Sequence, residues 1–236
     1  MKFFVTGDSH VAALKRGHAL LHSRNQLVPG HEFHFHPFGN AGLLRQPFFE
    51  REPGRVVVTE PSYRKRVPVL PADGFEPGGS VIAISGYFHF SGIWTAGLWR
   101  QGWLAEGPEG RGRGYSRGML GAIALHRMRY LLELGEALAE IGCRVCAIEG
   151  PGPFSHDPAL ERVPIARIDA IRRTCRDAVA EALSAIGIPV VEVPAQHRRS
   201  DGILDDALRN EDPTDTYHAG SEFGAIMIGR LQARYG

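Results

Sequence analysis

The sequence predicts a three-layer α/β/α sandwich built on a mainly parallel sheet of about five strands. Short apolar segments with strand character alternate along the chain with longer amphipathic segments of helical period. Several of the apolar segments run directly into a glycine, at Gly7, Gly39 and Gly86. The length of 236 residues, with 43% hydrophobic and 22% charged residues, is typical of one globular domain. We therefore expect residues 1–236 to form a single domain.

The N-terminal half begins with a strand at residues 2–6, a turn through Gly7-Asp8-Ser9-His10, and a helix. The helix is indicated by apolar side chains at helical spacing, namely Val11, Leu14, Leu20 and Leu21. A second strand at residues 32–38 ends in a glycine-containing turn, and residues 56–58 and 67–69 predict a short ribbon. Residues 80–85 (SVIAIS) have the continuous apolar pattern of a central parallel strand.

The C-terminal half opens with an irregular segment. Residues 90–118 are rich in Gly, Arg and Trp without a clear period, and we interpret them as an insertion that covers the strand ends as a lid. Regular patterns then predict helices and strands in alternation, at residues 120–141 (helix), 145–148 (strand), 168–186 (helix), 189–193 (strand) and 218–234 (helix).

This alternation implies right-handed crossovers and helices on both faces of the sheet, and hence a flavodoxin-like three-layer fold. In such sheets the ligand crevice lies beyond the carboxyl ends of the strands, near the point where the strand order reverses. The turns at Gly7, Gly39 and Gly86 all follow strands on that edge.

Net charge, hydropathy and cysteine content indicate which binding partners and which cellular compartment to expect. The formal net charge of +1 favours neither nucleic acid nor an anionic membrane, and no apolar stretch approaches a membrane span. The three cysteines have no framework spacing, and Cys143 and Cys146 lie on opposite faces of a predicted strand, which indicates core packing in a reducing compartment. Only three apolar residues follow Lys2, so we predict no secretory signal and a cytoplasmic protein.

Ser9 is the first candidate for chemistry. It lies where a strand turns into a helix, so its hydroxyl would project into the crevice with the helix amides and the positive dipole end behind it. That environment favours a developing oxyanion. Ser and Asp are also the preferred helix-capping residues, so the turn alone indicates a site and a cap equally well.

A second polar block, Asp215-Thr216-Tyr217-His218, lies at the predicted start of the last helix. A carboxylate three residues before an imidazole can reach its Nδ1–H, which fixes the tautomer that leaves Nε2 free to accept a serine proton. The alternative is that Asp215 caps the helix and His218 is a solvated residue of its first turn.

The two blocks together resemble those of the SGNH/GDSL hydrolase superfamily, in which Gly-Asp-Ser closes the first strand and Asp-x-x-His lies near the C-terminus. The resemblance implies that Ser9 is the nucleophile, that His218 acts as general base and then acid, and that Asp215 orients the imidazole. It also implies hydrolysis of an ester through an acyl-enzyme, with no cofactor and no metal ion.

The second block of that family supplies a glycine N–H to the oxyanion hole. Residues 38–42 (FGNAG) are similar to its Gly-x-x-Gly form, which makes Gly39 the candidate donor. Backbone donors held in place before the reaction typically contribute about 10²–10³ in rate. An ordinary glycine turn is the alternative interpretation.

The third block departs from the family pattern. The family has Gly-x-Asn-Asp, with the Asn side chain completing the oxyanion hole, whereas this chain has Gly86-Tyr87-Phe88-His89. The Phe88 side chain cannot donate a hydrogen bond, which leaves three interpretations. Asn40 or His89 donates to the oxyanion instead, the oxyanion hole stabilises the intermediate less than in the family, or the protein binds a ligand without hydrolysing it.

Other polar residues have weaker functional interpretations. We interpret His10 as a residue of the first helical turn, with an active-site role as the secondary reading. His31, His34 and His36 include a pair on one strand face, as metal ligands can, but no nearby acid completes a set, so we expect structural roles. Aromatic and arginine side chains of the insertion indicate either a cleft for sugars or acyl groups or a packed surface: Trp94, Trp99, Trp103, Arg100, Arg111, Arg113 and Arg117.

The preferred hypothesis is a serine esterase that acts on a small-molecule or glycan ester, with carbohydrate O-deacylation as its finer form; an acyltransferase would carry the same residues. A metal-dependent phosphoesterase that uses Asp8 and His10 is the second hypothesis. A non-catalytic binding protein on the same scaffold is the third. The sequence predicts no nucleic-acid or membrane partner and leaves the oligomeric state open.

Overall fold

The computed structural model describes residues 1–94, 102–104 and 113–236. Five parallel strands form the central sheet in the order β10-β9-β6-β1-β2, which confirms the predicted fold class. The order reverses between β1 and β6, since β2 lies on one side of β1 and the later strands lie on the other. The strands of this sheet are β1 (Lys2–Asp8), β2 (Glu32–Gly39), β6 (Ser80–Ser85), β9 (Val145–Ile148) and β10 (Val190–Val191).

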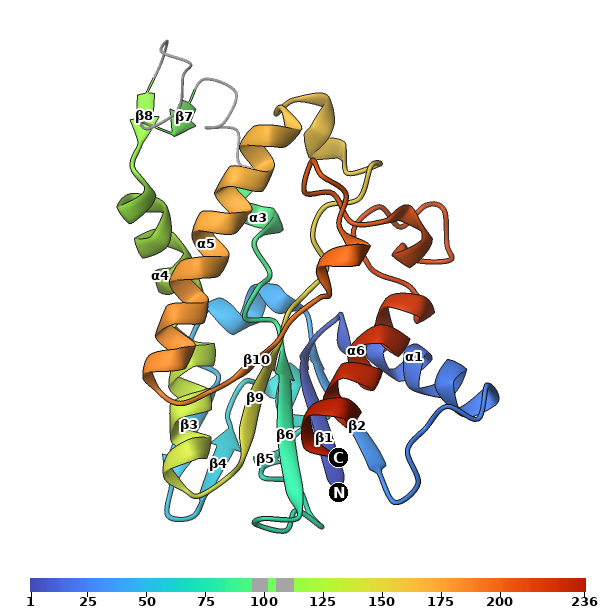
Figure 1. Ribbon diagram of the computed structural model, residues 1–236. Helices are drawn as coiled ribbons and strands as arrows, with labels where there is room; N and C mark the ends of the chain where they lie inside the picture. Colours follow the sequence, from blue (N-terminus) through green and yellow to red (C-terminus); the bar gives the residue numbers. More distant parts are fainter. Residues whose placement is uncertain (95–101, 105–112) are drawn as a thin grey trace.

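Helices cover both faces of the sheet. In Figure 1, α4 and α5 lie on one side of the strands and α1 and α6 on the other. Alternate residues of the strands serve the two layers: Phe4 and Ile82 belong to the core beneath α4 and α5, and Phe3 and Val81 to the core beneath α1 and α6. The helices are α1 (Val11–Ser23), α2 (Pro61–Arg64), α3 (Ser91–Trp94), α4 (Arg117–Glu140), α5 (Ile165–Ala185) and α6 (Ser221–Tyr235), with 3-10 turns η1 (Ala41–Arg45), η3 (Pro158–Glu161), η4 (Ala195–His197) and η5 (Asp206–Leu208).

Two small sheets accompany the central one. The predicted ribbon is confirmed, because β4 (Arg55–Val58) pairs antiparallel with β5 (Val69–Leu70), and β3 (Phe49–Glu52) adds a strand that the sequence did not indicate. Within the predicted insertion, β7 (Gly102–Leu104) pairs with β8 (Arg113–Tyr115), so its described part contains regular structure. The remainder of the predicted lid, residues 95–101 and 105–112, lies outside the described residues (Figure 1).

The last helix begins later than predicted. The sequence pattern placed its start at His218, but α6 begins at Ser221. Long-range backbone contacts cause the difference: Arg209 forms an isolated bridge with Ala219, and the Gly220 amide donates to the Leu208 carbonyl at 2.8 Å. His218 therefore lies in an anchored loop in front of the helix.

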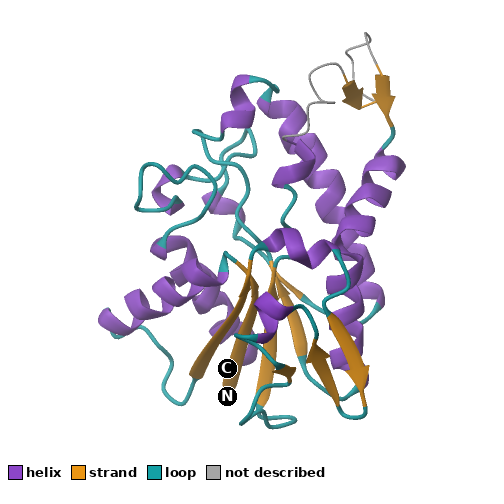
Figure 2. Cartoon of the chain, turned by 180° about the vertical axis from the view of Figure 1, so that it is seen from behind, coloured by secondary structure: helices purple, strands orange, loops and turns teal. Residues whose placement is uncertain are grey.

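The two ends of the sheet have different surroundings. Figure 2 shows both termini at the amino ends of the strands, away from the loops that gather at the carboxyl ends. None of the helices in the described part of the chain has both the length and the apolarity that a membrane span requires.

Candidate active site

The turn that carries Ser9 is fixed by close contact between β1 and β6. Gly7 has φ +132°, and a Cβ there would lie 2.1 Å from the backbone oxygen of Ser85. Only glycine fits this position, because both the positive φ and the approach of the two backbones exclude a side chain. β1 then ends at Asp8, α1 begins at Val11, and Ser9 is left half-buried at the carboxyl edge of the sheet, as predicted.

Ser9, His218 and Asp215 form a continuous chain of hydrogen-bond contacts. Ser9 Oγ lies 2.9 Å from His218 Nε2, although the residues are 209 positions apart in sequence. His218 Nδ1 lies 2.9 Å from Asp215 Oδ2 and 3.0 Å from Oδ1. The order hydroxyl, imidazole, carboxylate is the arrangement in which the imidazole can accept the hydroxyl proton while the carboxylate stabilises the resulting imidazolium.

Several donors surround the Asp215 carboxylate. Oδ1 accepts from the backbone amides of Tyr217 and His218 at 3.1 and 3.0 Å, and Oδ2 accepts from Asn210 Nδ2 at 2.7 Å. Partial burial alone would raise the pKa of Asp215, but the two backbone donors and the His218 imidazole outweigh it and lower the pKa. The carboxylate is therefore ionised at neutral pH.

Packing of α1 against α6 brings the two distant blocks together. A Cβ on Gly224 of α6 would lie 1.9 Å from the Ala13 carbonyl oxygen, and one on Gly17 of α1 would lie 2.0 Å from the Gly224 backbone. The glycines thus let the helices that follow Ser9 and His218 approach to backbone contact. Asn210 N also donates to the His218 carbonyl at 3.0 Å, which holds the loop from its other side.

Asp8 is the centre of a second polar cluster. The sequence named Asp8 and His10 together in the phosphoesterase hypothesis, but it did not predict that His89 joins them. The Asp8 carboxylate is fully buried, and Oδ1 accepts from the Ser85 hydroxyl and the His10 amide at 3.0 and 3.1 Å. Oδ2 lies 3.0 Å from His10 Nδ1 and 3.2 Å from His89 Nδ1. Burial alone would raise the pKa of Asp8 and lower that of His10; their mutual attraction outweighs burial, so the pKa of Asp8 lies well below its usual range and that of His10 is raised.

The same three residues could hold a cation. One ligand atom each from Asp8, His10 and His89 lies within 4.8 Å of the others, and the His10 ring is 5.4 Å from the His218 ring, centroid to centroid. A carboxylate with two imidazoles is a donor set that suits zinc and similar transition metals. The hydrogen bonds of the Asp8 carboxylate account for the arrangement without an ion.

Gly39 lies beside the nucleophile turn. It ends β2, pairs with Asp8 in the sheet register and has φ +117°. Asn40 follows at an exposed position, and its Oδ1 accepts from the Gly42 amide at 2.8 Å, so the Nδ2 group is the end of the side chain that can donate elsewhere. His89, in contrast, has partners at both ring nitrogens: Asp8 at Nδ1 and the Ser91 hydroxyl at Nε2, 3.0 Å away.

A small cleft of about 40 Å³ opens next to His218. His10, Phe88 and His89 form one side of it, and residues 150–154 after β9 form another. Phe88 is buried and contributes an apolar wall. The cleft is thus apolar near the β6 end.

The structure brings only part of the predicted aromatic and arginine set to this cleft. Trp94 lines it and donates from Nε1 to Asp157 Oδ2 at 3.3 Å. Arg117 begins α4. Trp99, Arg100 and Arg111 lie outside the described residues, as do the side chains of Trp103 and Arg113. His34 and His36 stack with Phe4 along β2, consistent with the structural role expected for them.

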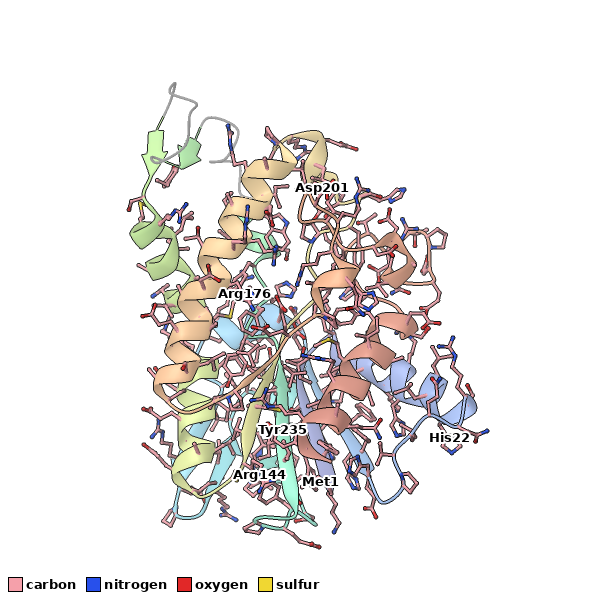
Figure 3. All side chains as sticks on the ribbon, in the orientation of Figure 1. Met1, His22, Arg144, Arg176, Asp201 and Tyr235 are labelled. Carbon is pink, nitrogen blue, oxygen red and sulfur yellow. The ribbon has the colours of Figure 1, made fainter. Side chains whose placement is uncertain are left out.

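A second cavity, of about 390 Å³, lies at the other end of the sheet between Arg144, Pro189 and Tyr235. Figure 3 shows Met1, Arg144 and Tyr235 together near the amino ends of the strands, far from Asp201 and the loops at the carboxyl ends. The residues predicted for chemistry all lie at the carboxyl ends, so this cavity is separate from the candidate site.

Comparison with known proteins supports the fold. No protein-family model matches the sequence, and no curated protein matches it either. Solved structures do match across the whole chain at low identity. A Bacteroides fragilis protein assigned as an acylhydrolase is 11% identical with a TM-score of 0.50, over 99% of this chain and 86% of that one.

Two further structures have the same degree of similarity. A Slackia heliotrinireducens protein assigned as an SGNH hydrolase is 13% identical with a TM-score of 0.50, over 100% of this chain and 99% of that one. The periplasmic domain of a lipopolysaccharide acetyltransferase from Salmonella ser. Paratyphi A is 12% identical with a TM-score of 0.50, over 99% of this chain and 82% of that one. The chain therefore shares the fold of these three structures.

Proposed function

We propose that this protein is a serine hydrolase of ester bonds, with Ser9 as nucleophile, His218 as general base and acid, and Asp215 as the orienting carboxylate. The observation that carries the proposal is the contact chain from Ser9 Oγ through the His218 ring to Asp215, with distances of 2.9 Å at both links. These distances lie within hydrogen-bond reach, as nucleophile and base require. The fold, shared with acyl-transferring enzymes, supports the same conclusion.

In the proposed reaction, Ser9 Oγ attacks the ester carbonyl carbon while His218 Nε2 takes the hydroxyl proton. Collapse of the tetrahedral intermediate breaks the bond to the alkoxy oxygen, and His218 returns the proton to the leaving alcohol. Water then attacks the acyl-enzyme with His218 as base, and the acid is released. An acceptor hydroxyl in place of water would complete an acyl transfer by the same steps.

The proposed oxyanion donors are the Gly39 amide and the Asn40 Nδ2 group. Gly39 pairs with Asp8 immediately before the nucleophile, and Asn40 keeps a free donor end because Gly42 binds its carbonyl end. His89 is less suited to this role, since Asp8 and Ser91 already engage both of its ring nitrogens. Separate Asn40→Ala and His89→Ala substitutions distinguish the two: a loss of about 10²–10³ in kcat is expected for the first.

As its finer form, we propose a small acyl group on a carbohydrate as the substrate. The cleft beside His218 has aromatic walls in Phe88, Phe90 and Trp94, and aromatic faces suit sugars and acyl chains. One protein with this fold acts as a lipopolysaccharide acetyltransferase. A small-molecule or glycan ester partner and a cytoplasmic location stay predictions.

A fluorophosphonate probe tests the mechanism directly. We expect the probe to label Ser9 in the wild-type protein, and Ser9→Ala to abolish both labelling and hydrolysis of short-chain esters. Ser85→Ala is the matched control, because its hydroxyl binds Asp8 rather than His218. Full activity in His218→Ala would remove the proposed mechanism, and a folded protein that is never labelled would favour a non-catalytic binding protein.

A metal-dependent phosphoesterase is the second candidate, favoured by the cluster of Asp8, His10 and His89. Chelation separates the two functions. We expect EDTA to leave ester hydrolysis unchanged, whereas loss of activity with EDTA and its recovery with a divalent cation would favour the phosphoesterase.

A further inference from the structure

Two arginines face each other across a small cavity next to the candidate site. Arg45 ends η1 and Arg127 lies in the middle of α4. A Cβ on Gly92 would lie 2.8 Å from Arg127 Nη1 and 3.2 Å from Arg45 Nη2, so both guanidinium groups flank one point. The cavity has a volume of about 10 Å³, and Leu44, Met128 and Leu131 form its apolar wall. It holds about one water as it stands, so a carboxylate or phosphate group would enter as the exposed Arg45 side chain moves aside.

Neither guanidinium group has an anionic partner. Within residues 1–94, 102–104 and 113–236, no carboxylate lies within 4.0 Å of Arg45 or Arg127. Arg127 Nη1 is inaccessible to solvent and has no hydrogen-bond partner. Burial, and then the nearby positive charge of Arg45, lower the pKa of Arg127. By comparison, the Arg51 guanidinium binds both Glu136 and Glu140.

An unpaired guanidinium beside a second cation is unfavourable in the absence of a ligand. A buried polar group without a hydrogen-bond partner destabilises the fold, and a charged one does so more. Burial and a neighbouring like charge that perturb an ionisable group are common at functional sites. Arginine offers planar, bidentate donors that match carboxylate and phosphate geometry.

The cavity adjoins the cleft of the proposed active site. Gly86 and His89 line both, so His89 forms the wall between them. Ala41, which also lines the arginine cavity, directly follows the Gly39-Asn40 turn. A group bound between the arginines would therefore lie next to the cleft beside His218.

We propose that Arg45 and Arg127 form an anion subsite and that the substrate is an ester carrying a carboxylate or phosphate group. This inference rests on the proposed function for the reaction, but the subsite itself is defined by the two arginines. The anionic group belongs either to the acyl part or to the alcohol part of the ester. The two arginines would bind the anionic group in the same way in either case, and matched pairs of substrates distinguish the two positions.

The test compares anionic and neutral esters in the wild-type protein and the double variant Arg45→Gln/Arg127→Gln. For the acyl part, the pair is mono-4-nitrophenyl succinate and 4-nitrophenyl butyrate. For the alcohol part, it is 4-acetoxybenzoate and its methyl ester. We expect a preference for the anionic member of one pair of about 10–100-fold in kcat/KM, and a ratio near one in the double variant.

Arg129→Gln is the matched control on the same helix. Its guanidinium lies over the Tyr130 ring, 4.3 Å from the centroid, and donates to the His126 carbonyl at 2.8 Å, outside the cavity. The control should retain the wild-type preference. If the double variant does not fold, the single variant Arg45→Gln replaces it in the comparison, because Arg45 is exposed and its substitution should not disturb the core.

A binding measurement separates failure of the subsite from failure of the proposed function. Inorganic phosphate at constant ionic strength should raise the Tm of the wild-type protein and of Arg129→Gln, but not of the double variant. If this pattern holds and no ester is hydrolysed, the subsite stands and the proposed reaction falls. Two results together would overturn the subsite. The first is that the wild-type protein hydrolyses both members of each ester pair at equal rates. The second is that phosphate does not raise the Tm of the wild-type protein, or raises the Tm of the double variant equally.

Discussion

Replacement of Asp215 by Asn is a sharp test of the proposed triad, because the structure dictates how the amide must sit. Oδ1 accepts from two backbone amides, so the oxygen of the new side chain has to occupy that position. The NH2 group then takes the Oδ2 position, 2.9 Å from His218 Nδ1. There it can only donate, so its contact with His218 Nδ1 favours the tautomer with the proton on Nε2. The competing acceptor is the oxygen at the Oδ1 position, 3.0 Å from Nδ1, which already accepts from two backbone amides.

The wrong tautomer removes the base. An Nε2–H directed at Ser9 Oγ cannot accept the hydroxyl proton. Asn210 Nδ2 also loses its acceptor at the Oδ2 position, and a flip of the Asn210 amide would lose the bond that its Oδ1 accepts from the Asp212 amide at 3.2 Å. Such tautomer errors lower kcat by about 10⁴, which corresponds to about 5.4 kcal/mol in the activation free energy.

Steady-state hydrolysis of a chromogenic short-chain ester measures the effect, and the rate of fluorophosphonate labelling provides a second readout. Asp212→Asn is the matched control, since the Asp212 carboxylate binds only Thr214 and lies outside the contact chain. The control should stay within a few-fold of the wild type. Activity of Asp215→Asn within tenfold of the wild type, in a protein of unchanged Tm, would refute the reasoning about the tautomer.

Two further predictions concern stability. Gly224→Ala places a Cβ 1.9 Å from the Ala13 carbonyl oxygen and should lower the free energy of unfolding, measured in urea, by about 1–3 kcal/mol or more. Gly229→Ala on the same helix is the control: its Cβ has nothing within 4 Å, so it should leave the free energy of unfolding unchanged or raise it. Equal effects of the two substitutions would contradict the close packing of α1 against α6. Because Asp8 raises the pKa of His10, protonated His10 stabilises the fold below pH 6.5, and this contribution disappears as the pH rises through the raised pKa. The difference in unfolding free energy between the wild type and His10→Gln should therefore be larger below pH 6.5 than in alkaline buffer, and a difference that does not change with pH would contradict the Asp8–His10 interaction.

Local patterns were sufficient to predict the sheet. The continuous apolar run at 80–85 is a central strand, and the turns at Gly7, Gly39 and Gly86 all lie at its carboxyl edge. Periodicity and glycine stops depend on neighbouring residues, so the sequence contains them directly. The start of α6 was predicted wrongly, because the Arg209–Ala219 bridge that delays it joins segments with no shared local pattern.

The candidate site was predictable to the extent that it follows strand ends. Ser9 and His218 were identified from two short blocks, and the structure places them within hydrogen-bond distance; their catalytic roles stay predictions. Asp8 and His10 were named together in the phosphoesterase hypothesis, but the participation of His89 was missed because it needs two different strand ends to direct side chains at one carboxylate. The position of His89 after the 80–85 strand was the available signal.

The arginine cavity had no signal of this kind. Arg45 lies after a strand end, but Arg127 belongs to the middle of a long helix whose pattern predicts only its apolar face. Their approach depends on how α4 packs over η1. Tertiary packing of this kind cannot be derived from the spacing of residues within either segment.

The separation of Ser9 and His218 along the chain has a consequence for synthesis. The proposed base is made 209 residues after the proposed nucleophile, which at roughly 5–20 residues per second is a delay on the order of 10–40 s. During that interval Ser9 lacks the His218 imidazole, and α1 lacks α6, against which it packs. In the proposed mechanism the nascent chain therefore attacks esters only after α6 is in place.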